Sequence, residues 1–279
     1  MLMNMQYPIS GPYKIYLIIL EWIIVLLFFE LAFGFLIRTK TKEENFKEFH
    51  ERALMWIAFG YSSMWIFNIL GDYYVDNSNF RLLLINIGYL AILIGVLFYV
   101  YMMERYVQIL GRKYTLSYLF SGLFIGFLVL LFFYMEYIVY YMVVFIPFFF
   151  VFLFYYFGKL RAIYIKRNQL ARYEWGMLIF IVSCLIIFLG YGMTTDFARE
   201  LFSLGIIFRL IGDLLQIGGF ILLVGFLIAI PSISEYDWQD KIDAIMLMHK
   251  NGLFIYKRFY RRESSDLESS LYTGYLASI

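Results

Sequence analysis

The sequence has few of the residues on which disulfides, metal centres and most catalytic sites depend. Among its 279 residues there is one cysteine and there are two histidines. A single thiol, Cys184, excludes an intrachain disulfide, and its position in an apolar segment favours a packing role. His50 and His249 are far apart and have no helper residues nearby, so we expect no metal site and no cofactor. We also find no Ser-His, Cys-His or phosphate-loop pattern, so we do not expect an enzyme.

Charge is also scarce, at 16% of residues, whereas 63% are hydrophobic. A soluble domain does not need so much apolar surface, so the composition predicts a multi-pass helical protein of the cell membrane, with the lipid bilayer as its main partner. The formal net charge of +2 gives no reason to expect a nucleic-acid partner. The amino-terminal residues lack a basic region and a cleavage site, so we interpret the first apolar segment as retained.

Seven apolar segments are each long enough to cross a bilayer core of about 30 Å. They predict an all-α membrane protein built as a seven-transmembrane-helix bundle. The predicted spans are 16–37, 53–75, 82–103, 115–135, 138–157, 175–193 and 203–230.

The distribution of Lys and Arg predicts the orientation of the bundle. The basic residues after the first, third and fifth segments are Arg38, Lys40, Lys42, Lys47, Arg52, Arg105, Arg112, Lys113, Lys159, Arg161, Lys166, Arg167 and Arg172. The opposite side has only Lys14, Arg81 and Arg199. Because positive loops stay in the cytoplasm, we predict that the N-terminus is outside and the C-terminus is cytoplasmic.

The pattern changes after the last apolar segment, and we expect two domains, 1–236 and 237–279. Residues 242–249 and 253–260 are typical of strands, and the Asn251-Gly252 pair between them is typical of a tight hairpin turn. Residues 267–279 favour a helix. A short β-hairpin plus helix is too small to fold alone, so we interpret this cytoplasmic tail as a partial, truncated domain.

The last apolar segment contains three polar residues that need an explanation. Arg209, Asp213 and Gln216 are spaced four and three residues apart, which puts them on one helical face. Asp213 is too short to reach the interface, and an acid in the membrane costs about 2.5–3.5 kcal/mol unless it faces protein or water. Its position therefore predicts polar partners on other helices.

Most other polar residues of the spans are predicted at the same outer depth. We predict a pocket open to the outside, formed mainly by the first, second, third and seventh segments and containing some of the tyrosines and tryptophans. Arg209 is its cationic centre, held by Asp213 and either Asp72 or Glu21. The candidate ligand-binding residues are Arg209, Asp213, Gln216, Glu21, Asn68, Asp72 and Asn86, and the aromatic candidates are Trp22, Trp65, Tyr73 and Tyr191. The alternative is that these polar groups only bond helices together.

Two further features are assigned from position alone. Glu30 lies deeper than the other acids and has no basic partner at its depth, so we interpret it as a candidate proton-linked residue or as a partner of Ser62 or Ser63. Gly122 and Gly126 in the fourth segment are typical of close helix packing.

The tail resembles the opening strand–turn–strand–helix of roadblock- and longin-like domains, which are frequent in archaeal proteins. The resemblance is carried by the strand ending at His249, the Asn251-Gly252 turn and the helix entry at 271–276. It implies that the tail binds or regulates a small GTPase, or forms a homodimer.

The predicted layout of the spans also resembles seven-helix receptors and the seven-helix sensor modules of some histidine kinases. Glu104-Arg105-Tyr106 is similar to a receptor motif, but a charged tripeptide at a membrane boundary is the preferred interpretation. The last segment has no lysine for a retinal Schiff base.

Together these features predict a membrane sensor or receptor-like protein, in which a small extracellular ligand enters an outer polar pocket and the cytoplasmic tail signals. Two alternatives stay open: a membrane anchor or scaffold for the tail, and a secondary transporter. Transport requires a polar path through the inner half, for which Glu30 is the main candidate.

Overall fold

The computed structural model describes residues 7–40, 46–106, 114–165, 170–198, 205–229, 244–248 and 254–259. Its contacts divide the chain into two units, Met1–Ile230 and Pro231–Ile279. The domain boundary predicted from the sequence, after residue 236, lies outside the described residues.

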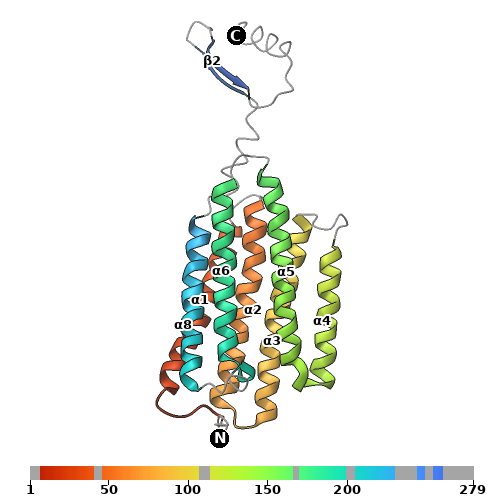
Figure 1. Ribbon diagram of the computed structural model, residues 1–279, viewed down its shortest axis with the longest axis vertical. Helices are drawn as coiled ribbons and strands as arrows, with labels where there is room; N and C mark the ends of the chain where they lie inside the picture. The colour runs from red at the N-terminus through yellow and green to blue at the C-terminus, as the bar shows by residue number, and fades with distance from the viewer. Residues whose placement is uncertain are drawn as a thin grey trace. The chain divides into compact units, whose positions relative to one another are not determined.

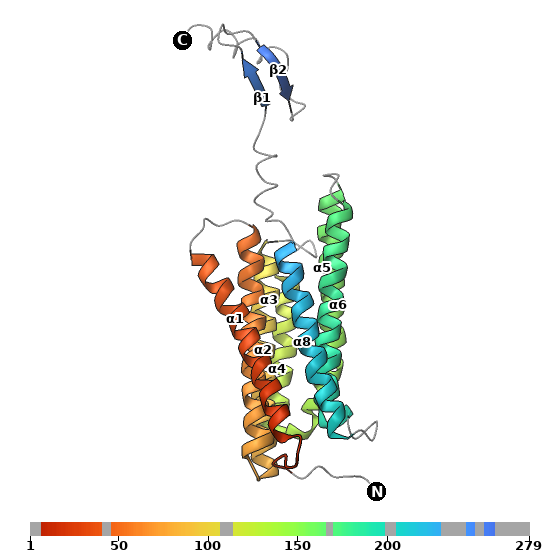
Figure 2. The same ribbon diagram turned by 90° about the vertical axis from the view of Figure 1, so that its left-hand side faces the viewer.

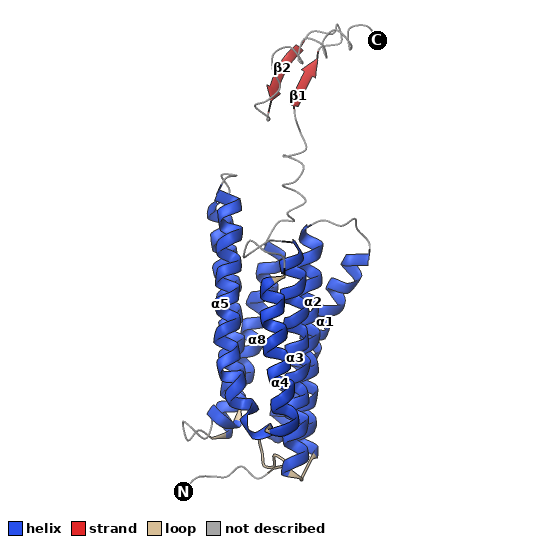
Figure 3. Ribbon diagram, turned by 90° about the vertical axis from the view of Figure 1, so that its right-hand side faces the viewer, coloured by secondary structure: helices blue, strands red, loops and turns tan. Residues whose placement is uncertain are grey.

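The described parts of the first unit form a bundle of long helices (Figure 1; Figure 3). In chain order they are α1 (Lys14–Lys40), α2 (Phe46–Tyr74), α3 (Ser78–Tyr106), α4 (Thr115–Phe133), the 3₁₀ turn η1 (Met135–Tyr137), α5 (Ile138–Ile165), α6 (Leu170–Thr194) and α8 (Ile206–Ala229).

Six helical segments in the described part of the chain are long and apolar enough to cross a membrane. They are Lys14–Ile37, Glu51–Tyr74, Ser78–Arg105, Thr115–Phe133, Met135–Tyr156 and Ile206–Gly225. Helix α6 adds a shorter apolar segment, Leu178–Thr194. Large apolar side chains such as Leu26, Phe132 and Val144 are exposed on the outside of the bundle. Because acyl chains can cover such surfaces, the architecture is compatible with membrane insertion as a multi-pass helical protein.

Two helix pairs, α2–α3 and α6–α8, make the most extensive contacts in the bundle (Figure 1). Glycines permit this closeness. A Cβ atom at Gly95 of α3 would lie 2.5 Å from the backbone oxygen of Trp56 in α2. Gly190 of α6 and Gly212 of α8 face each other in the same way, because a Cβ on either would lie 2.6 Å from the other's oxygen. Each pair is therefore joined backbone to backbone.

The glycines expected to permit close packing in the fourth segment do not do so. A Cβ atom at Gly122 or Gly126 would have no atom of the described residues within 4 Å. The prediction was wrong because small residues mark a contact only when a neighbouring helix faces them. Helix α4 packs less extensively on its neighbours than α2 does on α3.

Short connections define one end of the bundle. Helix α2 ends at Tyr74 and α3 begins at Ser78, and the side chain of Asn77 caps α3 by accepting hydrogen bonds from the N–H groups of Asn79 (2.9 Å) and Phe80 (3.2 Å). We call this the Asn77 end; α1, α3 and α8 begin there, and α2 and α6 end there (Figure 2).

At the opposite end, Glu104 has a structural role. Its carboxylate accepts hydrogen bonds from the N–H of Leu116 (2.9 Å) and from the N–H and Oγ of Ser117 (both 2.7 Å), and it is fully buried. Capping the first turn of α4 satisfies donors that a helix leaves unpaired. This contact accounts for the acid in the receptor-like tripeptide without any signalling role.

In the second unit, β1 (Ala244–Met248) pairs antiparallel with β2 (Phe254–Phe259). The register places Ala244 opposite Phe259 and Met248 opposite Phe254. The Asn251-Gly252 turn and the predicted helix 267–279 lie outside the described residues.

Candidate functional site

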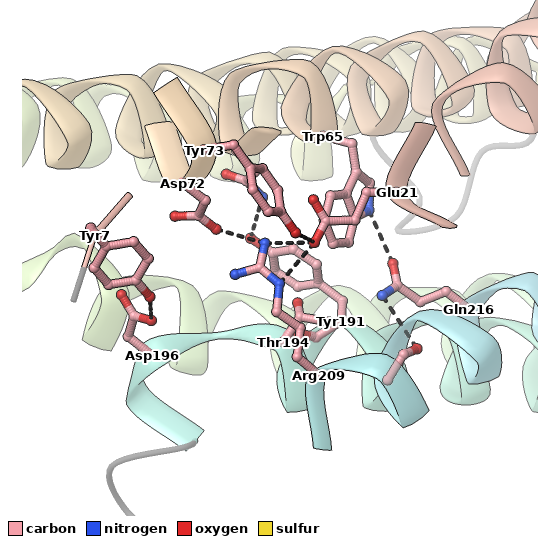
Figure 4. A network of polar contacts seen from close by, with 12 residues as sticks. Tyr7, Glu21, Trp65, Asp72, Tyr73, Tyr191, Thr194, Asp196, Arg209 and Gln216 are labelled. Carbon is pink, nitrogen blue, oxygen red and sulfur yellow. Dashed lines mark hydrogen bonds and ion pairs between the residues drawn. The ribbon is translucent and has the colours of Figure 1, made fainter. Parts of the chain in front are cut away.

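Arg209 of α8 is the centre of a buried ionic cluster at the Asn77 end. Its side chain is 2% exposed. Its Nε donates to Glu21 Oε1 of α1 at 2.8 Å, and Nη2 lies 2.7 Å from the same oxygen and 2.6 Å from Asp72 Oδ2 of α2. Figure 4 shows the guanidinium extending from its own helix towards both carboxylates. One arginine thus joins three helices.

Tyr73 supports this pair from α2. Its hydroxyl donates to Glu21 Oε1 at 3.0 Å, and its ring lies 5.7 Å from the Arg209 guanidinium carbon. Glu21 is fully buried, and a buried carboxylate needs several such partners to offset the cost of leaving water. The adjacent positions 72 and 73 both contribute because the last turn of α2 faces the cluster.

A second arginine, Arg81 of α3, extends the cluster towards the surface. Its Nε donates to Asp72 Oδ1 at 2.8 Å, and its Nη2 lies 2.6 Å from Asp196 Oδ2. The ring of Tyr7 lies 3.3 Å from the guanidinium carbon, and the Tyr7 hydroxyl donates to Asp196. The backbone N–H of Ile9 donates to the backbone carbonyl oxygen of Asp72 at 2.9 Å. The amino-terminal segment therefore packs directly on the ionic cluster.

Deeper in the bundle, Gln216 of α8 makes a separate link to α2. Its Oε1 accepts hydrogen bonds from the Tyr61 hydroxyl and from Trp65 Nε1, the latter at 3.0 Å. Its Nε2 donates to the backbone oxygen of Gly212 at 3.4 Å. Gln216, Trp65 and Arg209 are all nearly inaccessible to solvent.

Two buried polar side chains beside these links are incompletely bonded. Asn68 of α2 donates through Nδ2 to the Tyr191 hydroxyl of α6 at 3.3 Å, but its Oδ1 has no hydrogen-bond partner among the described residues. Asp213 of α8 is 0% exposed, and neither of its carboxylate oxygens has such a partner. Buried polar atoms without partners are rare in proteins and require an explanation.

A cavity of about 80 Å³ lies beside this cluster, and Asp213, Glu21 and Gln216 are not among its lining residues. Its wall includes charged, amide and aromatic side chains from α2, α3, α6 and α8. The lining residues that carry polar or aromatic groups are Trp65, Asn68, Asp72, Arg81, Tyr89, Tyr191, Thr194, Thr195, Asp196, Phe197 and Arg209. Pockets for drug-sized ligands measure about 300–1,000 Å³, so this cavity has room only for a much smaller polar molecule or group.

The structure brings together most of the residues selected from the sequence. Arg209, Glu21 and Asp72 are in direct contact, and Gln216 and Asn68 flank them. One expected pairing is wrong: Glu21 and Asp72 both hold Arg209, whereas Asp213 makes no hydrogen bond to it. The long guanidinium extends away from α8 to the neighbouring helices, and the short Asp213 side chain does not follow it.

Asn86 lies apart from the cluster. Its Nδ2 donates to the backbone oxygen of Met135 at 3.3 Å, so it connects α3 to the reversal at η1. The residue that α3 contributes to the ionic cluster is instead Arg81. Helix α6 supplies Tyr191 and Thr194 to the cavity wall.

Two other expectations also differ from the structure. Ser62, one of the two serines expected to bond Glu30, instead donates to the backbone oxygen of Val25 at 2.9 Å. Glu30 itself lies on an exposed face of α1, and its proton-linked role stays a prediction. Trp22 is 39% exposed on α1 and does not line the cavity. A single depth coordinate cannot tell which side of a helix faces its neighbours.

Sequence reasoning missed Arg81, which it counted only as a loop charge. A usable signal was present, because the connection between α2 and α3 is short and places the first turn of α3 beside the last turn of α2. An acid and an arginine on those two turns are then within reach of each other. Within the described residues, no group of three His, Cys, Asp or Glu side chains is arranged to hold a metal ion.

Comparison of the chain with protein-family models, with curated proteins and with solved structures finds no match.

Proposed function

We propose that this chain is a receptor-like protein of the cell membrane that binds a small polar ligand in the cavity at the Asn77 end. In this proposal α6 also spans the membrane, which brings the number of spans to seven. The N-terminus and the Asn77 end face the outside, and the C-terminus is cytoplasmic. The excess of Lys and Arg in the loops of the opposite end supports this orientation.

The observation that carries the proposal is the way the two close helix pairs are connected. Arg209 and Gln216 link α8 to α2, the Asn68–Tyr191 bond links α2 to α6, and the Arg81–Asp196 pair links α3 to the residues after α6. Each of these four links includes at least one residue that lines the cavity. A ligand there competes for the same polar groups, so its binding changes how the α6–α8 pair is held against the α2–α3 pair.

The tail supplies the output in this proposal. Its resemblance to roadblock- and longin-like domains supports a small GTPase or a second copy of the tail as the cytoplasmic partner. Movement of the helix pairs then changes the availability of the tail for that partner.

A cavity-filling substitution tests ligand binding without removing any charge. The full-length protein in lipid nanodiscs is screened for thermal stabilisation by small acids, amines and neutral polar compounds. Leu82 lines the cavity, so we expect Leu82→Phe to abolish stabilisation by any compound that binds there. Leu84→Phe, on the same helix but away from the cavity lining, is the matched control and keeps it.

Two results contradict the proposal. One is a screen in which no compound stabilises the wild type, and the other is stabilisation that survives Leu82→Phe. If, in addition, the isolated tail captures the same partner with the same affinity as the full-length protein, the spans act as an anchor and not as a receptor.

A further inference from the structure

The segment before α1 contacts three separate parts of the bundle. The Tyr7 hydroxyl donates to Asp196, which follows α6, and the Tyr7 ring lies 3.3 Å from the guanidinium carbon of Arg81 in α3. The backbone N–H of Ile9 donates to the backbone carbonyl oxygen of Asp72 in α2 at 2.9 Å. Residues 7–9, which we call the strap, therefore contact both helix pairs at once.

Each residue of the bundle in these contacts also lines the cavity, since Asp72, Arg81 and Asp196 are all part of its wall. The Arg81–Asp196 ion pair, at 2.6 Å, joins the α2–α3 pair to the residues after α6. Figure 4 shows the Tyr7 ring beside Asp196 and far from Gln216. Tyr7 therefore lies against the part of the cavity wall where the two helix pairs are joined by an ion pair.

The contacts of Tyr7 lie nearer to solvent than the centre of the ionic cluster. The side chains of Arg81 and Asp196 are 13% and 35% exposed, whereas that of Arg209 is 2% exposed. Water competes for polar contacts that it can reach, so these contacts are weaker than the buried ones. Tyr7 can therefore leave its place while the buried ion pairs of Arg209 persist.

The other end of the strap is fixed. Ile9 is 2% exposed, and the N–H of Lys14 at the start of α1 donates to the backbone oxygen of Gly11 at 3.2 Å. Gly11 has a φ of 106°, a conformation that is strained for any residue with a side chain. This turn directs the strap back onto the end of α2. The strap thus has an anchored end at Ile9 and a more exposed end at Tyr7.

We infer that the strap is a latch that restricts entry to the cavity from the Asn77 end, and that release of Tyr7 from Arg81 and Asp196 admits solutes. The inference deepens the proposed function, on which it rests for the ligand, because it names what regulates access to the same cavity. Access itself is measurable without any ligand.

A cysteine on the cavity wall measures this access. Thr194 lines the cavity and is 6% exposed, so Thr194→Cys, combined with Cys184→Ser to remove the native thiol, places a reporter there. The full-length protein in lipid nanodiscs is treated with aminoethyl methanethiosulfonate, and mass spectrometry gives the rate of modification. A buried thiol reacts when the structure around it opens, so the rate measures how often the cavity opens.

Loss of Tyr7 is expected to accelerate the reaction of the reporter. Tyr7→Ala removes a ring contact with a cation and a hydrogen bond to a carboxylate, so we expect the rate to rise at least about tenfold. Tyr7→Phe keeps the ring and loses the hydroxyl, and its rate should lie between those of Tyr7→Ala and the parent. Tyr13→Ala is the matched control, because Tyr13 also precedes α1 and is 40% exposed, and it should leave the rate unchanged.

The native thiol tests whether the change is local. Cys184 lies in α6 and is not among the residues that line the cavity. In a protein that keeps Thr194, we expect Cys184 to react at the same rate with and without Tyr7→Ala. The inference is wrong if Cys184 is accelerated as much as the reporter, since the whole bundle has then loosened.

The results separate the latch from the ligand site. The latch inference is wrong if the reporter reacts no faster after Tyr7→Ala, if it already reacts in the parent as fast as a free thiol, or if Tyr13→Ala has the same effect. In each case the ligand site is still decided by the Leu82→Phe test. If Tyr7→Ala alone accelerates the reporter but ligand binding survives Leu82→Phe, the proposed function fails and the latch stands.

Discussion

The contact between α2 and α3 and the contact between α2 and α8 hold helices together in opposite ways. In the first, Gly60 and Gly95 allow backbones to touch, with a Cβ on Gly60 only 2.7 Å from the oxygen of Ala91. In the second, the long side chains of Arg209 and Gln216 bridge the space between the helices.

This difference indicates which helix contacts are rigid and which can adjust. Close backbone packing depends on many small dispersion contacts and has one arrangement. A polar bridge depends on a few strong contacts that a ligand, water or another side chain can replace. We therefore expect the α2–α3 and α6–α8 pairs to resist rearrangement, and the polar layer between them is where the proposed ligand would act.

The largest effect is expected from removing the arginine that joins the helix pairs. Arg209→Met leaves Glu21 and Asp72 buried without their common partner, and breaking a buried ion pair in this way costs about 3–5 kcal/mol. The free energy of unfolding in detergent micelles measures the loss. Arg105→Met, an exposed arginine of α3, is the control and changes it little. Equal losses in both variants would show that the ionic cluster contributes nothing special.

A smaller effect is expected inside a helix pair. Gly95→Ala forces the backbones of α2 and α3 apart, because its Cβ would lie 2.5 Å from the oxygen of Trp56; overpacking of this kind costs about 1–3 kcal/mol. Gly122→Ala has open space and gains about 0.5–1 kcal/mol from helix propensity. Unfolding of the two variants under identical conditions gives the comparison. The rigid-pair interpretation is wrong if both changes have the same sign.

Removing the unpaired acid is expected to stabilise the protein. Asp213→Leu replaces a buried carboxylate that has no hydrogen-bond partner in the described structure by an apolar side chain of similar size, and an unsatisfied buried group costs about 1–3 kcal/mol. The free energy of unfolding, measured in detergent micelles, should therefore rise. Asp72→Asn, which loses two arginine partners, should instead lower it. A destabilised Asp213→Leu protein would mean that Asp213 already has a partner.

The smallest effect concerns the deeper bridge. Gln216→Leu removes the acceptor of Tyr61 and Trp65, and hydrogen bonds between membrane helices contribute about 0.6 kcal/mol each. A modest loss of stability should accompany a shift in tryptophan emission, because Trp65 Nε1 loses its partner. Leu214→Val on the exposed side of α8 is the control and leaves the emission unchanged.

Much of the candidate site could be predicted from the sequence, because a charged side chain in an apolar segment must face protein or water and not lipid. Arg209, Glu21 and Asp72 were selected as charges that must not face lipid, and they do converge. Their pairing was not accessible, since it depends on the distance between helices and on the reach of each side chain. Asn86 was misplaced for the same reason: depth along a helix does not specify its rotation.

By itself, the sequence determined that long apolar helices form and that buried charges gather at one end, because the cost of unpaired polar groups in an apolar medium acts at every position. The tertiary structure alone decided that Arg81 joins the cluster, that α6 walls the cavity and that Asp213 stays unpaired. Those outcomes depend on which helices pack closely against each other, as they do where glycines face a neighbouring backbone. Which side chains then meet is a property of the assembled bundle.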